Sequence, residues 1–265
     1  MIIMMRGLYT AATGMNAQQT NIDMISNNLS NVNTTGFKKS RANFQDLMYQ
    51  QTRQPGTPNA QGGEIPVGTE IGHGTRMAAT QKLFTPGSPQ STDNPLDLVI
   101  EGDGFFEVLR PDGSIAYTRD GSFRQDSDGR LVTADGYPLQ PEIFIPENAT
   151  SVSITSDGTV SAQIAGQPEP NQLGQVELVN FSNPAGLNSE GRNLYTETAS
   201  SGQPMMGVPG EDGFGTISQG YLEMSNVKVV EEMVNMITAQ RSYEANSRSI
   251  QAADEMLNTA NQLRR

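Results

Sequence analysis

The chain has 265 residues and a formal net charge of −12, and it is long enough for one large domain or two ordinary ones. Residues 36–220 hold all 15 prolines, 25 of the 27 glycines and −11 of the net charge. This acidic middle argues against a nucleic-acid or anionic-membrane partner. No apolar run reaches the roughly 18 to 20 residues of a membrane span, so we expect no membrane insertion. The absence of cysteine excludes disulfides and thiolate chemistry.

Residues 1–35 show a seven-residue repeat that predicts a long amphipathic helix. One row is Leu8, Met15, Ile22 and Leu29, and a second row, three residues further on, is Ala11, Gln18, Ile25 and Val32. This a/d pattern is typical of a coiled-coil seam, although a helix packed on its own domain would show the same stripe. Gly36 is placed to end the helix in a left-handed conformation, with Phe37 folding back on the last turn.

Residues 36–82 lack a clear hydrophobic period. The stretch from 51 to 63 is polar and rich in glycine and proline, so we expect an extended segment or a long hairpin, with a flexible linker as the alternative. The single histidine, His73, lies between two glycines in this segment. It has no neighbouring pattern of nucleophile or metal ligands, and we interpret it as a loop residue.

Residues 83–206 contain short runs of β-forming residues at intervals near ten, with Asp-Gly pairs between many of them. Asp-Gly supplies the positive φ of tight hairpin turns, so the pattern predicts an antiparallel β domain. Residues 126–129, Asp-Ser-Asp-Gly, resemble the start of a calcium loop. An EF-hand needs glycine at the sixth and glutamate at the twelfth position, whereas here Gly129 is fourth and Tyr137 twelfth. We therefore expect no metal site, no cofactor and no catalytic group.

Residues 207–222 are interpreted as a return connector, and residues 223–265 as a second long helix without glycine or proline. Its apolar repeat is Leu222, Val229, Met236, Tyr243, Ile250 and Leu257. The companion row three or four residues away is mainly polar, and Val230, Val234 and Ile237 widen the stripe near its start only. The expected fold class is α+β, with paired, coiled-coil-like terminal helices that flank an antiparallel β-rich middle domain.

Several motifs resemble those of the bacterial flagellar rod and hook axial proteins. They are SNNLSNVNTTGFK at 26–38, NPLDL at 94–98, IEGDGFF at 100–106, YTRDGSF at 117–123 and SNVKVVEEMVNMITAQRSYEAN at 225–246. The signature residues in the first motif are Asn27, Asn28, Leu29, Asn31, Asn33, Gly36 and Phe37. The resemblance covers nearly the whole chain. The length, RQPG at 53–56 and ATQK at 79–82 are closest to the distal-rod branch of that family.

The resemblance implies a non-enzymatic subunit that assembles helically into a rigid, hollow rod. The terminal helices would line the inner tube (the D0 layer), and the β domain (D1) would face outward. The rod would cross the periplasm to the outer membrane, transmit motor torque to the hook, and let later subunits pass through its channel. Implied partners are proximal rod subunits below, hook subunits above, the surrounding P-ring and L-ring proteins, and the flagellar type III export apparatus, which exports subunits without a cleaved signal peptide.

Two alternatives remain open at this point. The chain could be a proximal rod or hook subunit of the same family, or a secreted β-domain hydrolase or adhesin that its helices multimerise. The connecting segment distinguishes a stiff rod from a flexible hook. We hypothesise that it wedges between subunits and stiffens the rod, through Arg53, Gln54, Pro55 and Gly56.

Overall fold

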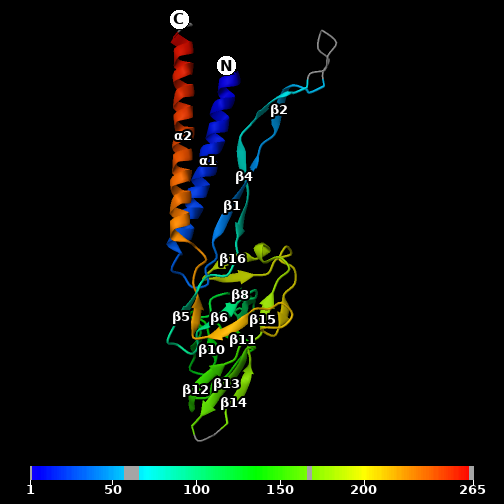
Figure 1. The fold of residues 1–265 in the computed structure, drawn as a ribbon, viewed down its shortest axis with the longest axis vertical. Helices are drawn as coiled ribbons and strands as arrows, with labels where there is room; N and C mark the ends of the chain where they lie inside the picture. Colours follow the sequence, from blue (N-terminus) through cyan, green and yellow to red (C-terminus); the bar gives the residue numbers. More distant parts are fainter. Residues whose placement is uncertain (1, 57–65, 166–168, 263–265) are drawn as a thin grey trace. The chain divides into compact units, whose positions relative to one another are not determined.

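A computed structural model describes residues 2–56, 66–165 and 169–262 (Figure 1). The chain divides into two compact units, each built from segments that are distant in sequence. The first unit comprises Met1–Leu29, Ser40–Gln81 and Lys228–Arg265, and the second comprises Ser30–Lys39 and Lys82–Val227. The fold is α+β, with a helix near each end of the chain and a β-rich middle, as the sequence predicts.

The first unit contains two long helices and a hairpin. Helix α1 spans Ile2–Ser30 and helix α2 spans Val229–Gln262, which correspond to about 44 and 51 Å at 1.5 Å per residue. The two helices run antiparallel and side by side (Figure 1). Residues 40–82, which follow α1 in sequence, form two successive antiparallel ladders, β1 (Ser40–Asp46) with β4 (Thr75–Lys82) and β2 (Tyr49–Arg53) with β3 (Thr69–Gly72). This segment is therefore a long β-hairpin, whose tip at 57–65 lies outside the described residues.

The second unit is an assembly of short antiparallel strands. Its largest sheet has the order β11-β7-β8-β17-β16, and a three-stranded sheet has the order β12-β13-β14. The remaining ladders pair β9 with β10, β15 with β18, β6 with β19, and β5 with β20. The strands are β5 (Pro89–Ser91), β6 (Leu98–Glu101), β7 (Phe106–Leu109), β8 (Ile115–Thr118), β9 (Arg124–Gln125), β10 (Leu131–Val132), β11 (Leu139–Gln140), β12 (Ala149–Ile154), β13 (Thr159–Ile164), β14 (Asn171–Gln175), β15 (Leu178–Asn180), β16 (Asn188–Gly191), β17 (Leu194–Thr196), β18 (Met205–Gly207), β19 (Thr216–Gln219) and β20 (Tyr221–Glu223), with a 3-10 turn at Pro184–Gly186.

The core of this second unit has an aliphatic part and an aromatic part. The aliphatic cluster includes Leu98, Leu131 and Leu178, each almost completely buried. The aromatic cluster centres on Phe105, whose ring meets Phe84 edge-on at 5.3 Å and Phe181 at 5.8 Å. Edge-to-face pairs add specific geometry to the area they bury. A third, smaller cluster consists of Val108, Ala116 and Leu194, so the short strands are held by several distinct clusters.

Several predicted boundaries are wrong. Helix α1 ends at Ser30 rather than near residue 35, because residues 31–36 form a turn in which Thr34 Oγ1 bonds to Asn31 Oδ1. The predicted connector at 207–222 contains β19 and most of β20, which complete the β unit. Leu222 consequently lies in a strand and not in the C-terminal helix. That helix begins six residues after the predicted start at 223, where the Glu232 N–H bonds to the Lys228 carbonyl.

Gly121 corrects the interpretation of the Asp-Gly pairs. Gly113, Gly129, Gly136 and Gly158 do have positive φ, but Gly121 does not. It is needed for a close backbone approach instead, because an added Cβ would collide with the Leu98 carbonyl. The Leu98 N–H bonds to the Gly121 carbonyl at 3.0 Å.

Candidate functional site

The helix pair of the first unit buries a row of small and polar residues on α2. On α2 the repeat Met236, Ile250 and Leu257 is half-buried, whereas Val229 and Tyr243 are 40% and 37% exposed. The most buried row on this helix is Glu232, Ala239 and Ala253, at 3 to 8% exposure, and Asn246 continues the same row. Small side chains let two helix backbones approach closely. This row is distinct from the mainly polar companion row of the sequence pattern, which includes Met233, Gln240 and Ser247.

The residues of both predicted rows on helix α1 are partly or fully buried. Leu8, Met15, Ile22 and Leu29 are half-buried, and Ile25 is 5% exposed. Val32 is half-buried but lies beyond the helix end. Gly14 lies beside the second of these rows, and an added Cβ there would sit 2.8 Å from Asn246 Nδ2 of α2. The helices thus meet where α1 has no side chain.

The hairpin packs on α1 through polar contacts. Arg6 Nη1 donates to Gln50 Oε1 at 2.5 Å, and the Thr75 N–H donates to Thr13 Oγ1 at 3.4 Å. The signature residue Asn28 is 2% exposed, and its amide both donates to and accepts from the Ser40 backbone at 2.9 Å. A buried amide that satisfies two backbone groups fixes the start of β1 against the end of α1.

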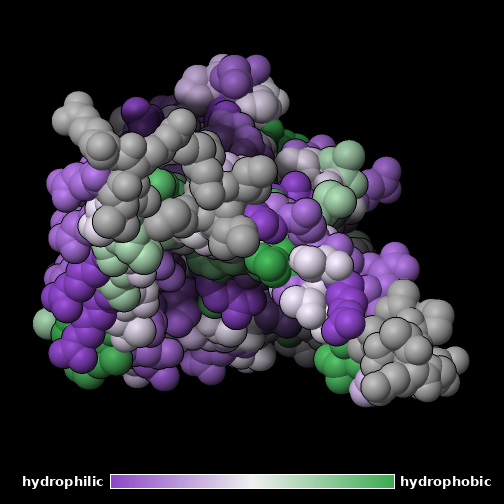
Figure 2. Space-filling model, turned by 90° about the horizontal axis from the view of Figure 1, so that it is seen from above, coloured by the Kyte–Doolittle hydropathy of each residue, from purple (hydrophilic) through white to green (hydrophobic). Residues whose placement is uncertain are grey.

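The outer face of α2 carries exposed apolar residues in its first three turns. Val230 is 77% exposed, and Met233, Val234 and Ile237 are 49 to 56% exposed. At 100° per residue these four positions lie on the side of the helix opposite Glu232, Met236 and Ala239. Figure 2 shows hydrophobic residues in separate patches among mostly hydrophilic ones on the face that it presents. Clustered apolar exposure of this kind marks an interaction surface.

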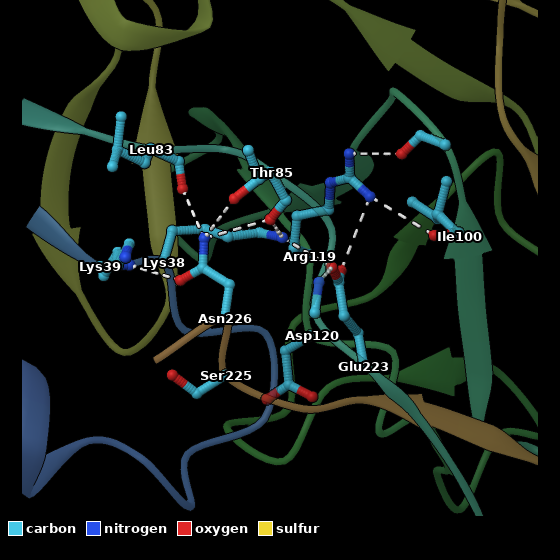
Figure 3. A network of polar contacts seen from close by, with 12 residues as sticks. Lys38, Lys39, Leu83, Thr85, Ile100, Arg119, Asp120, Glu223, Ser225 and Asn226 are labelled. Atoms are coloured by element: carbon cyan, nitrogen blue, oxygen red, sulfur yellow. Dashed lines mark hydrogen bonds and ion pairs between the residues drawn. The ribbon is translucent and has the colours of Figure 1, made fainter. Parts of the chain in front are cut away.

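A buried polar network lies in the second unit (Figure 3). The Glu223 carboxylate binds Lys38 Nζ at 2.6 Å, lies 3.6 Å from Arg119 Nη1, and accepts the Gly87 N–H at 2.8 Å. All three charged residues are no more than 2% exposed. Lys38 also donates to the Thr85 carbonyl at 2.9 Å, and Arg119 Nη2 donates to the Gly102 carbonyl at 2.7 Å.

Two further groups extend this network along the connecting segments. The Asn226 side chain donates to the Leu83 carbonyl at 2.8 Å and accepts the Lys39 N–H at 2.8 Å. The Gly36 N–H bonds to the Glu223 carbonyl at 2.8 Å. Gly36 has φ +67°, and an added Cβ would lie 2.7 Å from the Asp120 nitrogen, so glycine is required there. The network therefore ties together the segments 36–39, 83–87 and 223–226, which flank points where the chain passes from one unit to the other.

The network buries two cations, Lys38 and Arg119, with one anion, Glu223, so it carries a net positive charge away from water. Burial lowers the pKa of Lys38, and the neighbouring Glu223 carboxylate opposes that shift. Burial lowers the pKa of Arg119 in the same way, again opposed by Glu223. The Lys82 ammonium, whose pKa burial also lowers, lies 5.5 Å from the centroid of the Phe37 ring and 5.0 Å from that of Tyr195. Removal of Glu223 would leave buried positive charge without its main partner.

The other candidate residues of the sequence are exposed, except Asn31, which is half-buried. Asn33 is exposed, and Asn27 and Asn31 both make contacts within the described part of the chain. Arg53 ends β2, and Gln54, Pro55 and Gly56 follow it on the exposed surface. Asp126 and Asp128 both pair with Arg130, at 3.3 and 3.1 Å.

The described residues lack two kinds of feature. None of their helices is long and apolar enough to cross a membrane. No group of three or more histidine or acidic residues in the described ranges is arranged to hold a metal ion.

Comparison with known proteins places this architecture in a class. The model of the "Flagella basal body rod protein" family matches residues 8–38, the flagellar hook protein FlgE/F/G D1 domain matches residues 99–162, and the flagellar basal body rod FlgEFG protein C-terminal family matches residues 218–263. The helix-flanked β fold is therefore that of a flagellar rod or hook protein.

Similarity to individual proteins shows which member of this class the chain resembles. The chain is 55% identical to the flagellar basal-body rod protein FlgG of Borreliella burgdorferi, over 99% of this chain and 100% of that protein. It is 51% identical to the FlgG of Buchnera aphidicola and 48% identical to that of Caulobacter vibrioides, in each case over 98% of this chain and 100% of the relative. The chain belongs to the flagellar basal-body rod protein FlgG family. It is a structural subunit of the flagellar basal-body rod, and a hook subunit or a secreted hydrolase is not favoured.

Proposed function

We propose that this subunit polymerises helically into the rigid, hollow distal rod, with paired terminal helices inside and the β unit outside. Its partners would be further copies of the chain, proximal rod and hook subunits at the two ends, the P-ring and L-ring proteins around it, and the type III export apparatus that delivers it. In this arrangement the rod transmits torque across the periplasm, and later subunits pass along its channel. No reaction is assigned to it.

The observation that carries the proposal is the exposed apolar face of α2. Val230, Met233, Val234 and Ile237 lie opposite the row that packs inside the unit. Burying such side chains stabilises association by about 1.5–3 kcal/mol each when burial is complete. A helix with one face toward its own chain and an apolar face toward solvent is suited to a polymer in which neighbouring copies cover it.

The test is a double substitution on that face. Val234→Glu with Ile237→Glu should leave the circular dichroism of the monomer unchanged, because both side chains are about half exposed. The same variant should abolish straight tubes in negative-stain micrographs and motility in complemented cells. Val234→Leu with Ile237→Leu is the matched control, and it should retain both. Normal rods from the glutamate variant would show that this face is not an assembly surface.

We further propose that the hairpin stiffens the rod by wedging between neighbouring copies. Its support is the pair of ladders that hold residues 40–53 against 69–82, and the exposure of Arg53, Gln54, Pro55 and Gly56 beyond them. Deletion of residues 51–74 should give rods that bend under the electron microscope. Equally straight rods after the deletion would overturn the wedge, while leaving the polymer itself intact.

A further inference from the structure

A glutamate is buried on the aromatic face of the largest sheet in the second unit. Glu107 lies on β7, directly opposite Tyr117 of β8 and Gln140 of β11. It is 5% exposed, and its Oε2 atom is buried with no hydrogen-bond partner among the described residues. Leaving a buried carboxylate oxygen unpaired costs several kcal/mol in typical proteins.

Glu107 lines a pocket of about 250 Å³. The other lining residues are Gln140, Pro141, Glu177, Val179 and Met206. Burial raises the pKa of Glu107, and the charges of Glu177 and Glu197 raise it further. Burial, together with Glu107 and Glu197, likewise raises the pKa of Tyr117 to about 12. The site therefore combines negative charge at one edge with apolar surface at the other.

We propose that this pocket receives the guanidinium group of an arginine from a second copy of the chain. A guanidinium is planar and weakly hydrated, so it can lie on the apolar surface of Pro141 and Val179 and pair with a carboxylate at its edge. A chelated metal ion fits less well, because no suitable group of three ligands occurs among the described residues. The source of the arginine rests on the proposed polymer, in which copies lie side by side.

The chain has suitable donors. Among the described residues, five arginines on the exposed surface form no ion pair with another described residue: Arg41, Arg53, Arg76, Arg124 and Arg241. Two of the four lysines, Lys38 and Lys82, are already held inside the second unit. Arginine is therefore the better fit, and the described surface offers five candidates without an ion pair to another described residue.

The first test measures binding by the pocket itself and does not depend on rod assembly. The monomeric full-length protein is titrated with N-ethylguanidinium at constant ionic strength and followed by ¹⁵N NMR. Saturable shifts should appear at the amides of Glu107, Gln140 and Glu177, and n-butylammonium should produce at least threefold smaller shifts. Glu107→Gln should remove the saturable shifts, whereas Glu142→Gln, an exposed residue outside the pocket lining, should retain them. Absent shifts, or shifts unchanged by Glu107→Gln, would overturn the pocket.

The second test identifies the donor in assembled rods. Because the chain has no native cysteine, Glu107→Cys can be combined with a cysteine at each of the five arginines and treated in purified basal bodies with a bis-maleimide whose spacer spans the combined length of the two replaced side chains, a distance too long for a direct disulfide. One combination should yield covalently linked multimers on a denaturing gel, and each single-cysteine variant serves as its control. If rods form but no combination crosslinks, the second copy is not the donor. If wild-type chains form no rods, the proposed polymer fails instead, and the NMR result on the pocket still stands.

Discussion

Glu223→Gln tests the buried network in the second unit. The substitution preserves the shape of the side chain and an oxygen for the Gly87 N–H, but it removes the charge that faces Lys38 at 2.6 Å and Arg119 at 3.6 Å. Breaking a buried pair from one side costs about 3–5 kcal/mol, because the partner charge stays buried. For a unit of this size that loss lowers Tm by about 6–20 °C.

Differential scanning calorimetry measures this loss, with near-UV circular dichroism reporting on the aromatic core. Glu244→Gln is the control, because the Glu244–Arg248 pair is 3.9 Å long with side chains 66% and 81% exposed. Its removal should cost less than about 0.5 kcal/mol. If Glu223→Gln unfolds within 2 °C of the wild type (about 1 kcal/mol or less), or no differently from the control, then the network does not hold the connecting segments together.

Further substitutions probe Asn28, Gly74 and Glu107, with Asn33 and Gly7 for comparison. Asn28→Ala should destabilise the first unit by about 1–3 kcal/mol in urea unfolding, because it orphans two backbone groups, whereas Ala at the exposed Asn33 should cost little. Gly74→Ala should speed hydrogen exchange of the hairpin, because Gly74 has φ +108° and an added Cβ would collide with α1. Gly7→Ala should instead stabilise α1 by about 0.5–1 kcal/mol, because Gly7 has open space around it. The raised pKa of Glu107 means that the folded protein keeps this proton to higher pH than the unfolded chain does. The contribution of protonated Glu107 to folding stability is therefore complete below about pH 4 and is lost as the pH rises through its raised pKa. Because glutamine does not titrate, the Tm of Glu107→Gln should fall less than that of the wild type as the pH rises over this range.

The helices and the β-rich middle could be predicted because their signals are local. Heptad spacing and the segregation of glycine and proline reflect the geometry of single elements. The boundary errors have a physical reason as well. Leu222 keeps the seven-residue spacing of the helix but pairs with Gln90 in a strand, so the periodicity alone continued one repeat too far. The row of Glu232, Ala239, Asn246 and Ala253 was missed because small and polar residues leave no hydrophobic signal.

Most contacts of the buried network and of the Glu107 pocket could not be predicted from the sequence. Lys38 and Arg119 lie inside recognised motifs, which marks them as candidates, but their partner Glu223 is 185 residues from Lys38. Only the topology of the second unit brings these residues together. Glu107 had no signal at all, since a glutamate in an alternating strand normally faces solvent.

The division of the first unit into three separate segments has a consequence for the order in which the molecule can form. Its two helices are separated by nearly 200 residues, whereas most of the second unit is the continuous stretch 82–227. A chain delivered from its N-terminus can thus complete most of the β unit while α1 still waits for α2. The last segment to arrive is the one that closes the helix pair, and until then the face of α1 that packs on α2 has no cover from its own chain.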